Sequence, residues 1–194
     1  MSDDEILDFL KESLRLKRML RSGWVYSGVS LANVESVADH SFSVSLISLL
    51  VSMDEKKKGK EIDTQKVLIM ALLHDLSESV SQDIDRRVRK FSPEKYDAFK
   101  SELDLKATQF LLKLLPKLIA EDLDRIYQEF HEKKSIEAKI VSEADRLDTI
   151  LQLQEYIRLG HHSSNFSEFF DNFRKEVEKF EFSIVKKSAK KLLE

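Results

Sequence analysis

Hydrophobic residues recur at helical spacing along most of this chain, with polar residues between them. This pattern predicts helices over about residues 6–21, 36–53, 64–76, 93–115, 119–132, 135–159 and 167–190. Helix-end signals support several of these bounds: Ser2 begins a capping-like start, Ser92 precedes a proline, and Gly160 follows the longest helix. We expect residues 22–28 to form a loop and residues 77–89 to be polar and irregular.

The composition favours an all-α fold. Only four glycines and two prolines occur among 194 residues, while the helix-favouring Leu, Lys and Glu are abundant. The hydrophobic content of 42% is typical of a globular protein. Because there is no internal repeat, low-complexity tract or linker, we expect residues 1–194 to form a single domain.

The charge balance argues against some partners. The chain has 32 basic and 35 acidic residues, a net charge of -3, and so lacks the basic surplus of a nucleic-acid-binding protein. It has no cysteine, no secretory signal at its charged beginning and no apolar run near 18 residues. We therefore expect a cytoplasmic protein with neither a nucleic acid nor a membrane as partner.

The apolar helix over residues 64–76 contains two side chains that can bind a metal. Apolar residues fill most of residues 68–73, and His74 and Asp75 follow them directly. A buried polar group without a partner costs roughly 2–7 kcal/mol, and a charged one costs more. A bound cation would compensate for this pair.

Two further ligands complete a candidate site. His40 lies at the start of the helix over 36–53, where a lone histidine is more often a cap or a core hydrogen-bond partner. Asp145 lies on the longest helix beside apolar residues, and Asp148, one turn later, is the alternative. Two imidazoles and two carboxylates suit one divalent transition metal such as Mn, Co, Fe, Ni or Zn. Because such a metal activates water and polarises phosphoryl groups, the set indicates metal-assisted hydrolysis. The remaining histidines, His131, His161 and His162, are expected on the surface.

The ordered set His40, His74, Asp75 and Asp145 resembles the H…HD…D signature of the HD-domain metal-dependent phosphohydrolases. The elements Glu-Ser-Val-Ala-Asp-His40 and His-Asp-Leu-Ser-Glu78 are similar to those of the 5'-deoxynucleotidase branch of that superfamily. The resemblance covers roughly residues 10–160. It implies an HD-domain helical bundle with the metal at its centre, a C-terminal helix packed on this core, and assembly as a homodimer.

The resemblance also implies roles for individual residues. Glu78 is similar to the acidic residue that orients or deprotonates the attacking water. Asp83 resembles the residue that meets the sugar 3'-hydroxyl and helps to restrict the site to deoxyribose. Arg21 looks like the phosphate clamp, with Arg18 as the alternative. Trp24 is similar to the aromatic residue that lines the sugar pocket; otherwise it is a core side chain that anchors its loop.

The expected function is therefore hydrolysis of a small-molecule nucleotide, most simply a deoxyribonucleoside 5'-monophosphate, to nucleoside and phosphate. One alternative is an HD-domain phosphohydrolase that acts on a cyclic or polyphosphorylated nucleotide. The other is a non-catalytic helical adaptor, which would leave four buried ionisable residues without a reason.

Overall fold

The computed structural model describes residues 3–194. Within that range all of the regular secondary-structure elements are helices. The α-helices are α1 (Asp3–Ser13), α2 (Ser22–Tyr26), α3 (Val37–Lys57), α4 (Thr64–Leu73), α5 (Glu78–Ser81), α6 (Pro93–Leu112), α7 (Lys117–Glu132), α8 (Ile136–Arg158), α9 (Ser167–Val177) and α10 (Ser183–Leu193). Short 3-10 helices lie between them: η1 (Leu14–Arg18), η2 (Arg86–Phe91) and η3 (Ser163–Phe166). The all-α prediction is confirmed. The predicted capping residue Ser2 lies outside the described residues.

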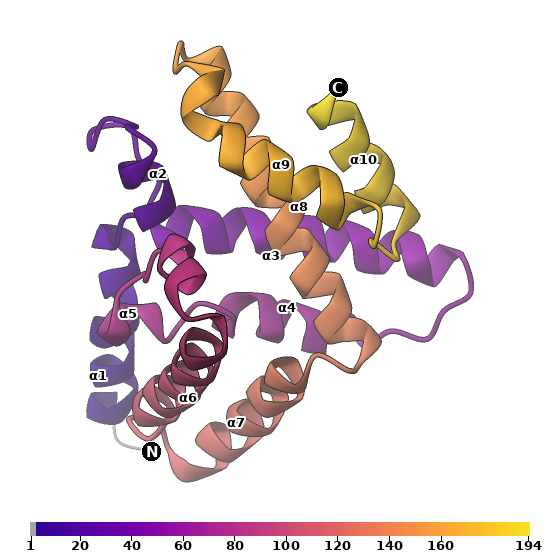
Figure 1. Ribbon diagram of the computed structural model, residues 1–194. Coiled ribbons are helices and arrows are strands. Elements are labelled where there is room, and N and C mark those ends of the chain that lie inside the picture. Colours follow the sequence, from indigo (N-terminus) through magenta and orange to yellow (C-terminus); the bar gives the residue numbers. More distant parts are fainter. Residues whose placement is uncertain (1–2) are drawn as a thin grey trace.

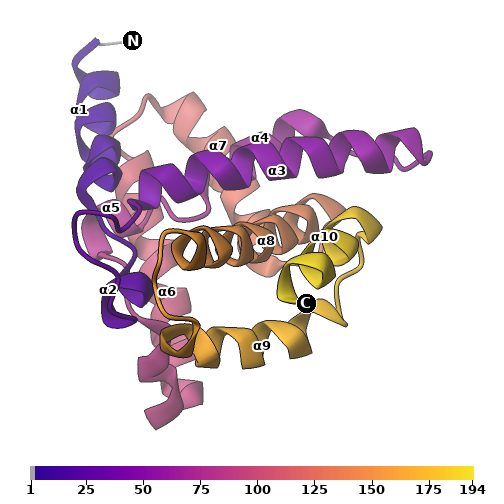
Figure 2. The ribbon, with the colours of Figure 1, turned by 90° about the horizontal axis from the view of Figure 1, so that it is seen from above.

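Helix α3 crosses the whole molecule and packs against both α4 and α8 (Figure 1). Helices α4 and α8 also contact each other, so these three helices form the centre of the fold. Helix α7 packs on α4, and α6 packs on α7. In Figure 2, α8 lies between α3 and α9, while α10 packs against α8. None of the described helices combines the length and apolar content needed to cross a bilayer.

The largest hydrophobic cluster joins α3, α4 and α8 to the last two helices. Val44, Met70, Ile140, Ile150 and Val185 are all fully buried in it. Burying one such side chain stabilises the fold by about 1.5–3 kcal/mol. This packing fixes the helices that carry the candidate ligands.

Side-chain caps set where the three central helices begin. Ser36 and Asp39 form a reciprocal capping box at the start of α3, which places His40 in the first turns of that helix. Asp63 accepts a hydrogen bond from the backbone of Lys66 at the start of α4. Ser135 caps α8 in the same way. Each cap satisfies an otherwise unpaired backbone N–H and stabilises its helix by about 1 kcal/mol.

The first predicted helix is shorter than its hydrophobic pattern indicates, and the following loop prediction is wrong in part. Helix α1 ends at Ser13 instead of continuing toward residue 21, and residues 22–26 form α2. The reason is tertiary pairing of the backbone. The amide of Arg21 donates to the carbonyl of Glu35, and the amide of Val37 donates to the carbonyl of Met19. These bonds hold residues 19–21 in extended form against the segment that leads into α3.

Other bounds differ in the middle of the chain. Helix α3 continues to Lys57, beyond the predicted end at Met53, whereas α4 ends at Leu73, before the predicted end at Leu76. The segment predicted as irregular, residues 77–89, contains α5 and part of η2. Because α4 ends early, the backbone turns at His74 and Asp75.

The predicted last helix over 167–190 is two helices, α9 and α10. Glu143 on α8 explains the break, because its carboxylate accepts hydrogen bonds from the backbone amides of Glu181 and Phe182. The Phe182 ring is buried in the core. The break between the two helices contains neither glycine nor proline, so the sequence gives no local signal for it.

Candidate metal centre

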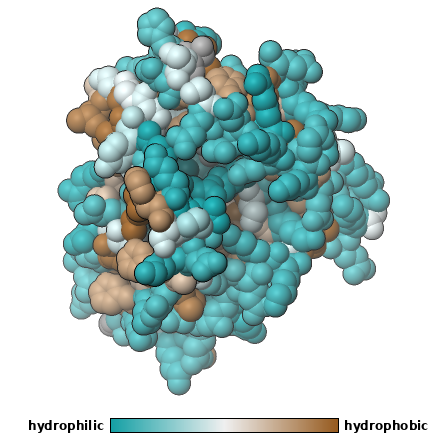
Figure 3. Space-filling view, in the orientation of Figure 1, coloured by the Kyte–Doolittle hydropathy of each residue, from teal (hydrophilic) through white to brown (hydrophobic). Residues whose placement is uncertain are grey.

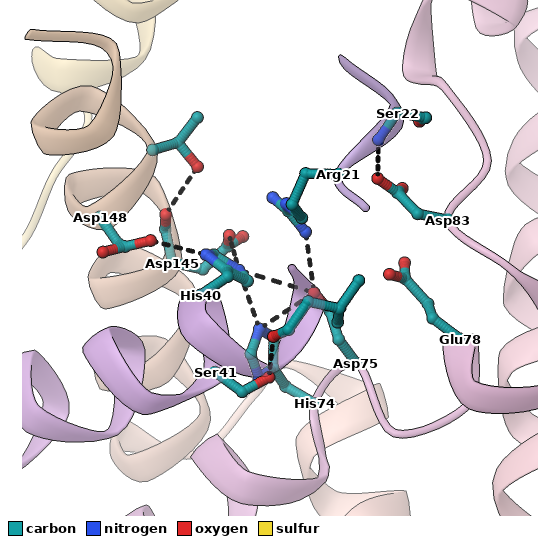
Figure 4. A network of polar contacts seen from close by, with 12 residues as sticks. Arg21, Ser22, His40, Ser41, His74, Asp75, Glu78, Asp83, Asp145 and Asp148 are labelled. Atoms are coloured by element: carbon teal, nitrogen blue, oxygen red, sulfur yellow. Dashed lines mark hydrogen bonds and ion pairs between the residues drawn. The ribbon is translucent and has the colours of Figure 1, made fainter. Parts of the chain in front are cut away.

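The four predicted ligands come from three elements that meet at the centre of the fold. His40 lies near the start of α3, and Asp145 lies on α8. His74 is the C-cap of α4, and Asp75 follows it in the turn. Figure 3 shows a largely hydrophilic face of the molecule that is hollowed near its middle. Figure 4 shows the four side chains directed toward one another.

The ligand atoms are close enough to share one ion. His40 Nε2 lies 3.2 Å from His74 Nε2, 3.5 Å from Asp75 Oδ2 and 3.3 Å from Asp145 Oδ1. His74 Nε2 and Asp75 Oδ2 are 3.3 Å apart. Atoms bound to one transition metal at about 2.0–2.2 Å are separated from each other by roughly these distances. His40, His74 and Asp145 therefore form a group of the size of a single-ion site, and Asp75 Oδ2 lies beside its two histidine nitrogens.

The partners of the two Nδ1 atoms indicate the protonation of the two Nε2 atoms, which face the centre of the cluster. His74 Nδ1 lies 2.7 Å from the carbonyl oxygen of Ala71, which can only accept, so Nδ1 carries a proton. His40 Nδ1 lies 2.6 Å from the Asp148 carboxylate, which favours the same tautomer. In neutral rings, both Nε2 lone pairs then face each other, and a cation between them would satisfy both. The residues present therefore fit a divalent metal.

This geometry distinguishes the two aspartates that the sequence left open. Asp145 faces His40 Nε2 together with the other candidate ligands, whereas Asp148 contacts Nδ1 on the opposite side of the ring. Asp148 is thus placed to orient His40.

The charges of the cluster favour a cation at its centre. Burial and the charge of Arg21 lower the pKa of His40, but Asp145 and Asp148 outweigh them and raise it to about 10. The carboxylates thus favour a positive charge at this ring, either a proton or the metal cation that would displace it. Burial raises the pKa of Asp75, yet His74 and Arg21 overcome this and hold it below its usual range. The pKa of Asp145 is also lowered, because Arg146 and His40 outweigh the effect of burial. Both carboxyl groups are therefore ionised and available as ligands.

Of the two candidate arginines, Arg21 is the one that the structure brings to this cluster. Its Nη1 donates to Asp75 Oδ2 at 3.0 Å, and the side chain is largely buried. Burial lowers the pKa of Arg21, but the charges of Asp75, Asp83 and Glu78 outweigh burial and raise the pKa above its usual value. The guanidinium therefore stays charged. Arg18 is exposed on η1.

Glu78 and Asp83 lie on the same side of the cluster as Arg21 (Figure 4). Glu78 begins α5 and is only 3% exposed, and its Oε2 atom is buried without a hydrogen-bond partner among the described residues. Burial, together with Asp75 and Asp83, raises the pKa of Glu78 well above its usual range. Asp83 accepts a 2.6 Å hydrogen bond from the backbone amide of Ser22, which fastens its loop to the start of α2.

Trp24 is a core side chain in this structure. It is 2% exposed, stacks on Phe169 with ring centroids 4.8 Å apart, and donates from Nε1 to Glu35 at 2.7 Å. This placement agrees with the alternative in which Trp24 anchors its segment to the bundle. A role in lining a sugar pocket stays a prediction.

The sequence did not identify one residue that lies next to the site. Lys100 of α6 contacts Glu78, although a single lysine on a charged helix carries no signal for such a contact. The role of Asp148 did have a signal, because two carboxylates one turn apart on a buried helix suggest a ligand and its partner.

Replacing Asp148 with asparagine is expected to weaken metal binding by about 10- to 100-fold, the usual cost of losing a partner that orients a histidine ligand. Asparagine keeps the volume but removes the charge that favours the Nδ1 protonated tautomer of His40. Metal titration by calorimetry of the wild type and the variant checks this. Equal affinities would show that Asp148 does not support His40.

Gln82 has an unusual backbone that turns the chain toward Asp83. Its φ of 67° and ψ of 159° lie in a region that is essentially restricted to glycine. We expect Gln82→Gly to stabilise the protein by about 1 kcal/mol, since relief of strain exceeds the entropy that glycine adds to the unfolded chain. Urea unfolding measures this, with Gln82→Ala as the control that keeps the strain. A Gln82→Gly protein no more stable than Gln82→Ala would contradict the expectation.

Comparisons with known proteins bear on this site. The model of a family described as HD domain matches residues 14–185. A 5'-deoxynucleotidase of Dictyostelium discoideum is 33% identical over 173 residues, which cover 87% of each chain. A human 5'-deoxynucleotidase is 29% identical over 167 residues, which cover 86% of this chain and 76% of the human protein.

Solved structures are similar as well. A conserved hypothetical protein from Pyrococcus furiosus superposes with a TM-score of 0.78 at 33% identity, covering 96% of this chain and 98% of that one. A predicted metal-dependent phosphohydrolase from Magnetospirillum magnetotacticum gives a TM-score of 0.67 at 21% identity, covering 97% of this chain and 92% of that one. The latter likeness supports the fold alone.

Proposed function

Because the chain belongs to the HD-domain family, we propose that it hydrolyses deoxyribonucleoside 5'-monophosphates to nucleoside and phosphate. The observation that carries this proposal is the grouping of His40, His74 and Asp145 inside the bundle, with Asp75 Oδ2 beside both histidine nitrogens. A divalent cation held there would supply Lewis acidity toward water and a phosphoryl oxygen. The mixed nitrogen and oxygen donors favour a transition metal, one of Mn, Co, Fe, Ni or Zn.

Arg21 is proposed to bind the phosphate. Its guanidinium stays charged in a largely buried position next to the cluster, and one nitrogen is held by Asp75. The planar fork leaves further donors for phosphoryl oxygens. A phosphate at this position lies beside the candidate metal ligands.

Glu78 is proposed to orient the attacking water and accept its proton. The unpartnered Oε2 is available as an acceptor, and the raised pKa makes the ionised carboxylate a stronger base than an ordinary glutamate. As the water oxygen bonds to phosphorus, the bond from phosphorus to the sugar 5'-oxygen breaks. The proton taken by Glu78 can then pass to that leaving oxygen.

Asp83 is proposed to meet the sugar 3'-hydroxyl. The backbone amide of Ser22 holds Oδ2, so the other carboxylate oxygen can accept from a hydroxyl group. Trp24 supports this arrangement by anchoring α2 in the aromatic core. Arg21 directly precedes α2, and Ser22, which holds Asp83, begins it. One short helix therefore connects the proposed phosphate contact to the proposed sugar contact.

A homodimer in the cytoplasm, with neither nucleic acid nor a membrane as partner, completes the proposal. Support for pairing comes from an exposed apolar stripe on α3, formed by Phe42, Leu46, Leu50 and Met53. Contiguous exposed apolar surface often marks a protein interface. Light scattering of the purified protein would give the mass of the assembly.

A phosphate-release panel tests the function. Deoxyribo- and ribonucleoside 5'-monophosphates, 3'-monophosphates, cyclic nucleotides and triphosphates are each incubated with Mn, Co, Fe, Ni or Zn. We expect release from deoxyribonucleoside 5'-monophosphates, loss of release with a chelator, and recovery when metal is returned. Faster release from cyclic or polyphosphorylated nucleotides would contradict the proposed substrate class. If no nucleotide released phosphate, the proposed activity would be contradicted.

A further inference from the structure

Glu78 is linked to α6 by a chain of polar contacts, which we call the Lys100 bridge and which comprises Ser77, Glu78, Lys100 and Asp104. Lys100 Nζ donates to Asp104 Oδ1 at 2.7 Å and to Glu78 Oε1 at 3.4 Å. Ser77 Oγ donates to the same Asp104 oxygen at 2.9 Å. The bridge therefore begins and ends on neighbouring residues at the start of α5.

The bridge lies at the packed boundary between α5 and α6. Ser77 and Glu78 are buried, while the side chains of Lys100 and Asp104 are each 21% exposed. Lys106 and Glu102 form another ion pair on α6, but their side chains are 71% and 65% exposed. Solvent screens such an exposed pair, so it contributes little. Lys100 differs because one of its partners is a buried carboxyl group beside the candidate metal centre.

The two oxygens of Glu78 have different surroundings. Lys100 contacts Oε1, whereas Oε2 is buried without a partner among the described residues. A cation that holds one oxygen limits rotation of the carboxyl group and fixes the direction of the other. We propose that Lys100 is a positioning residue that holds Oε1 of Glu78 and thereby presents Oε2 to the attacking water. This inference rests on the proposed function of Glu78.

Lys100 also acts on the charge of Glu78. The charged groups that act on this carboxyl are Arg21, Asp75 and Asp83 from the site and Lys100 from α6, whose other partner is Asp104. Burial, Asp75 and Asp83 raise the pKa of Glu78, whereas Arg21 and Lys100 lower it. Loss of Lys100 therefore raises the pKa further. Because Glu78 must be ionised to accept a proton, the acid limb of the pH–rate profile moves to higher pH.

The test compares Lys100→Met with Lys100→Arg, and uses Lys106→Met on the same helix as the matched control. For Lys100→Met we expect kcat at neutral pH to fall about 10- to 100-fold, as for a misplaced catalytic group. KM and metal content should stay near the wild type, and the acid limb should move to higher pH. Lys100→Arg should restore most of kcat and the pH profile, and Lys106→Met should behave as wild type.

Two results would overturn the inference. One is a Lys100→Met enzyme with the kcat and pH profile of the wild type. The other is a loss that appears in metal content or melting temperature and is not rescued by arginine, which would make Lys100 merely structural.

The inference can be separated from the proposed function. If the wild-type enzyme releases no phosphate from any nucleotide, the proposed function fails at once. Carbon-13 NMR titration of the Glu78 carboxyl then still tests the contact with Lys100. An unchanged titration midpoint in Lys100→Met contradicts the bridge, and a midpoint at higher pH supports it.

Discussion

Asp75→Ala is expected to remove the bound metal and to lower phosphate release by about 10³-fold or more, because a metal supplies several kcal/mol of transition-state stabilisation. Asp75 Oδ2 lies near both Nε2 atoms of the cluster and also pairs with Arg21. Its loss therefore removes one ligand and releases the candidate phosphate clamp. Elemental analysis and a phosphate-release assay on the same preparation measure both effects.

Asp97→Ala is a suitable control for that experiment. Asp97 is an exposed aspartate on α6 that pairs with Arg89, away from the candidate ligands. This variant should keep the metal and wild-type turnover. Melting temperatures of both variants would identify a loss that comes from unfolding. A folded Asp75→Ala protein with full metal content would contradict the ligand assignment.

Glu78→Gln should have the second largest effect, with metal content unchanged and kcat reduced by about 10²–10⁴-fold, the usual contribution of a general base. Glutamine has nearly the same shape as glutamate, but its amide cannot accept the proton of water. Glu78 is not one of the four candidate ligands, so the metal should remain. The residual activity should also lose the acid limb that ionisation of Glu78 gives the wild-type profile.

The exposed Glu102 offers the matched substitution, Glu102→Gln, which should leave kcat and the pH profile unchanged. Turnover near the wild-type value in Glu78→Gln would remove Glu78 from the chemistry. Loss of metal in that variant would instead assign Glu78 a part in holding the ion.

The sequence predicted much of this architecture because its strongest signals are local. Apolar residues at helical spacing and polar caps such as Asp63 and Ser135 are properties of neighbouring residues. His74 and Asp75 were recognisable because they follow an apolar run, where an isolated polar pair needs a partner.

The features that the sequence did not reveal depend on contacts between distant residues. Glu143 interrupts the C-terminal helix from 38 residues away. Asp145 and Asp148 lie one turn apart on the same helix, and only packing against α3 determines which one faces His40 Nε2. Lys100 reaches Glu78 because α5 packs on α6, and a lysine among many charged residues gives no sign of that contact.

The most direct test is an anomalous-scattering experiment on crystals of the protein grown with Mn or Co. We expect one strong peak per chain, within about 2.0–2.3 Å of donor atoms from His40, His74, Asp75 and Asp145. A peak bound by other residues, or a fully loaded crystal with no density between these four side chains, would contradict it.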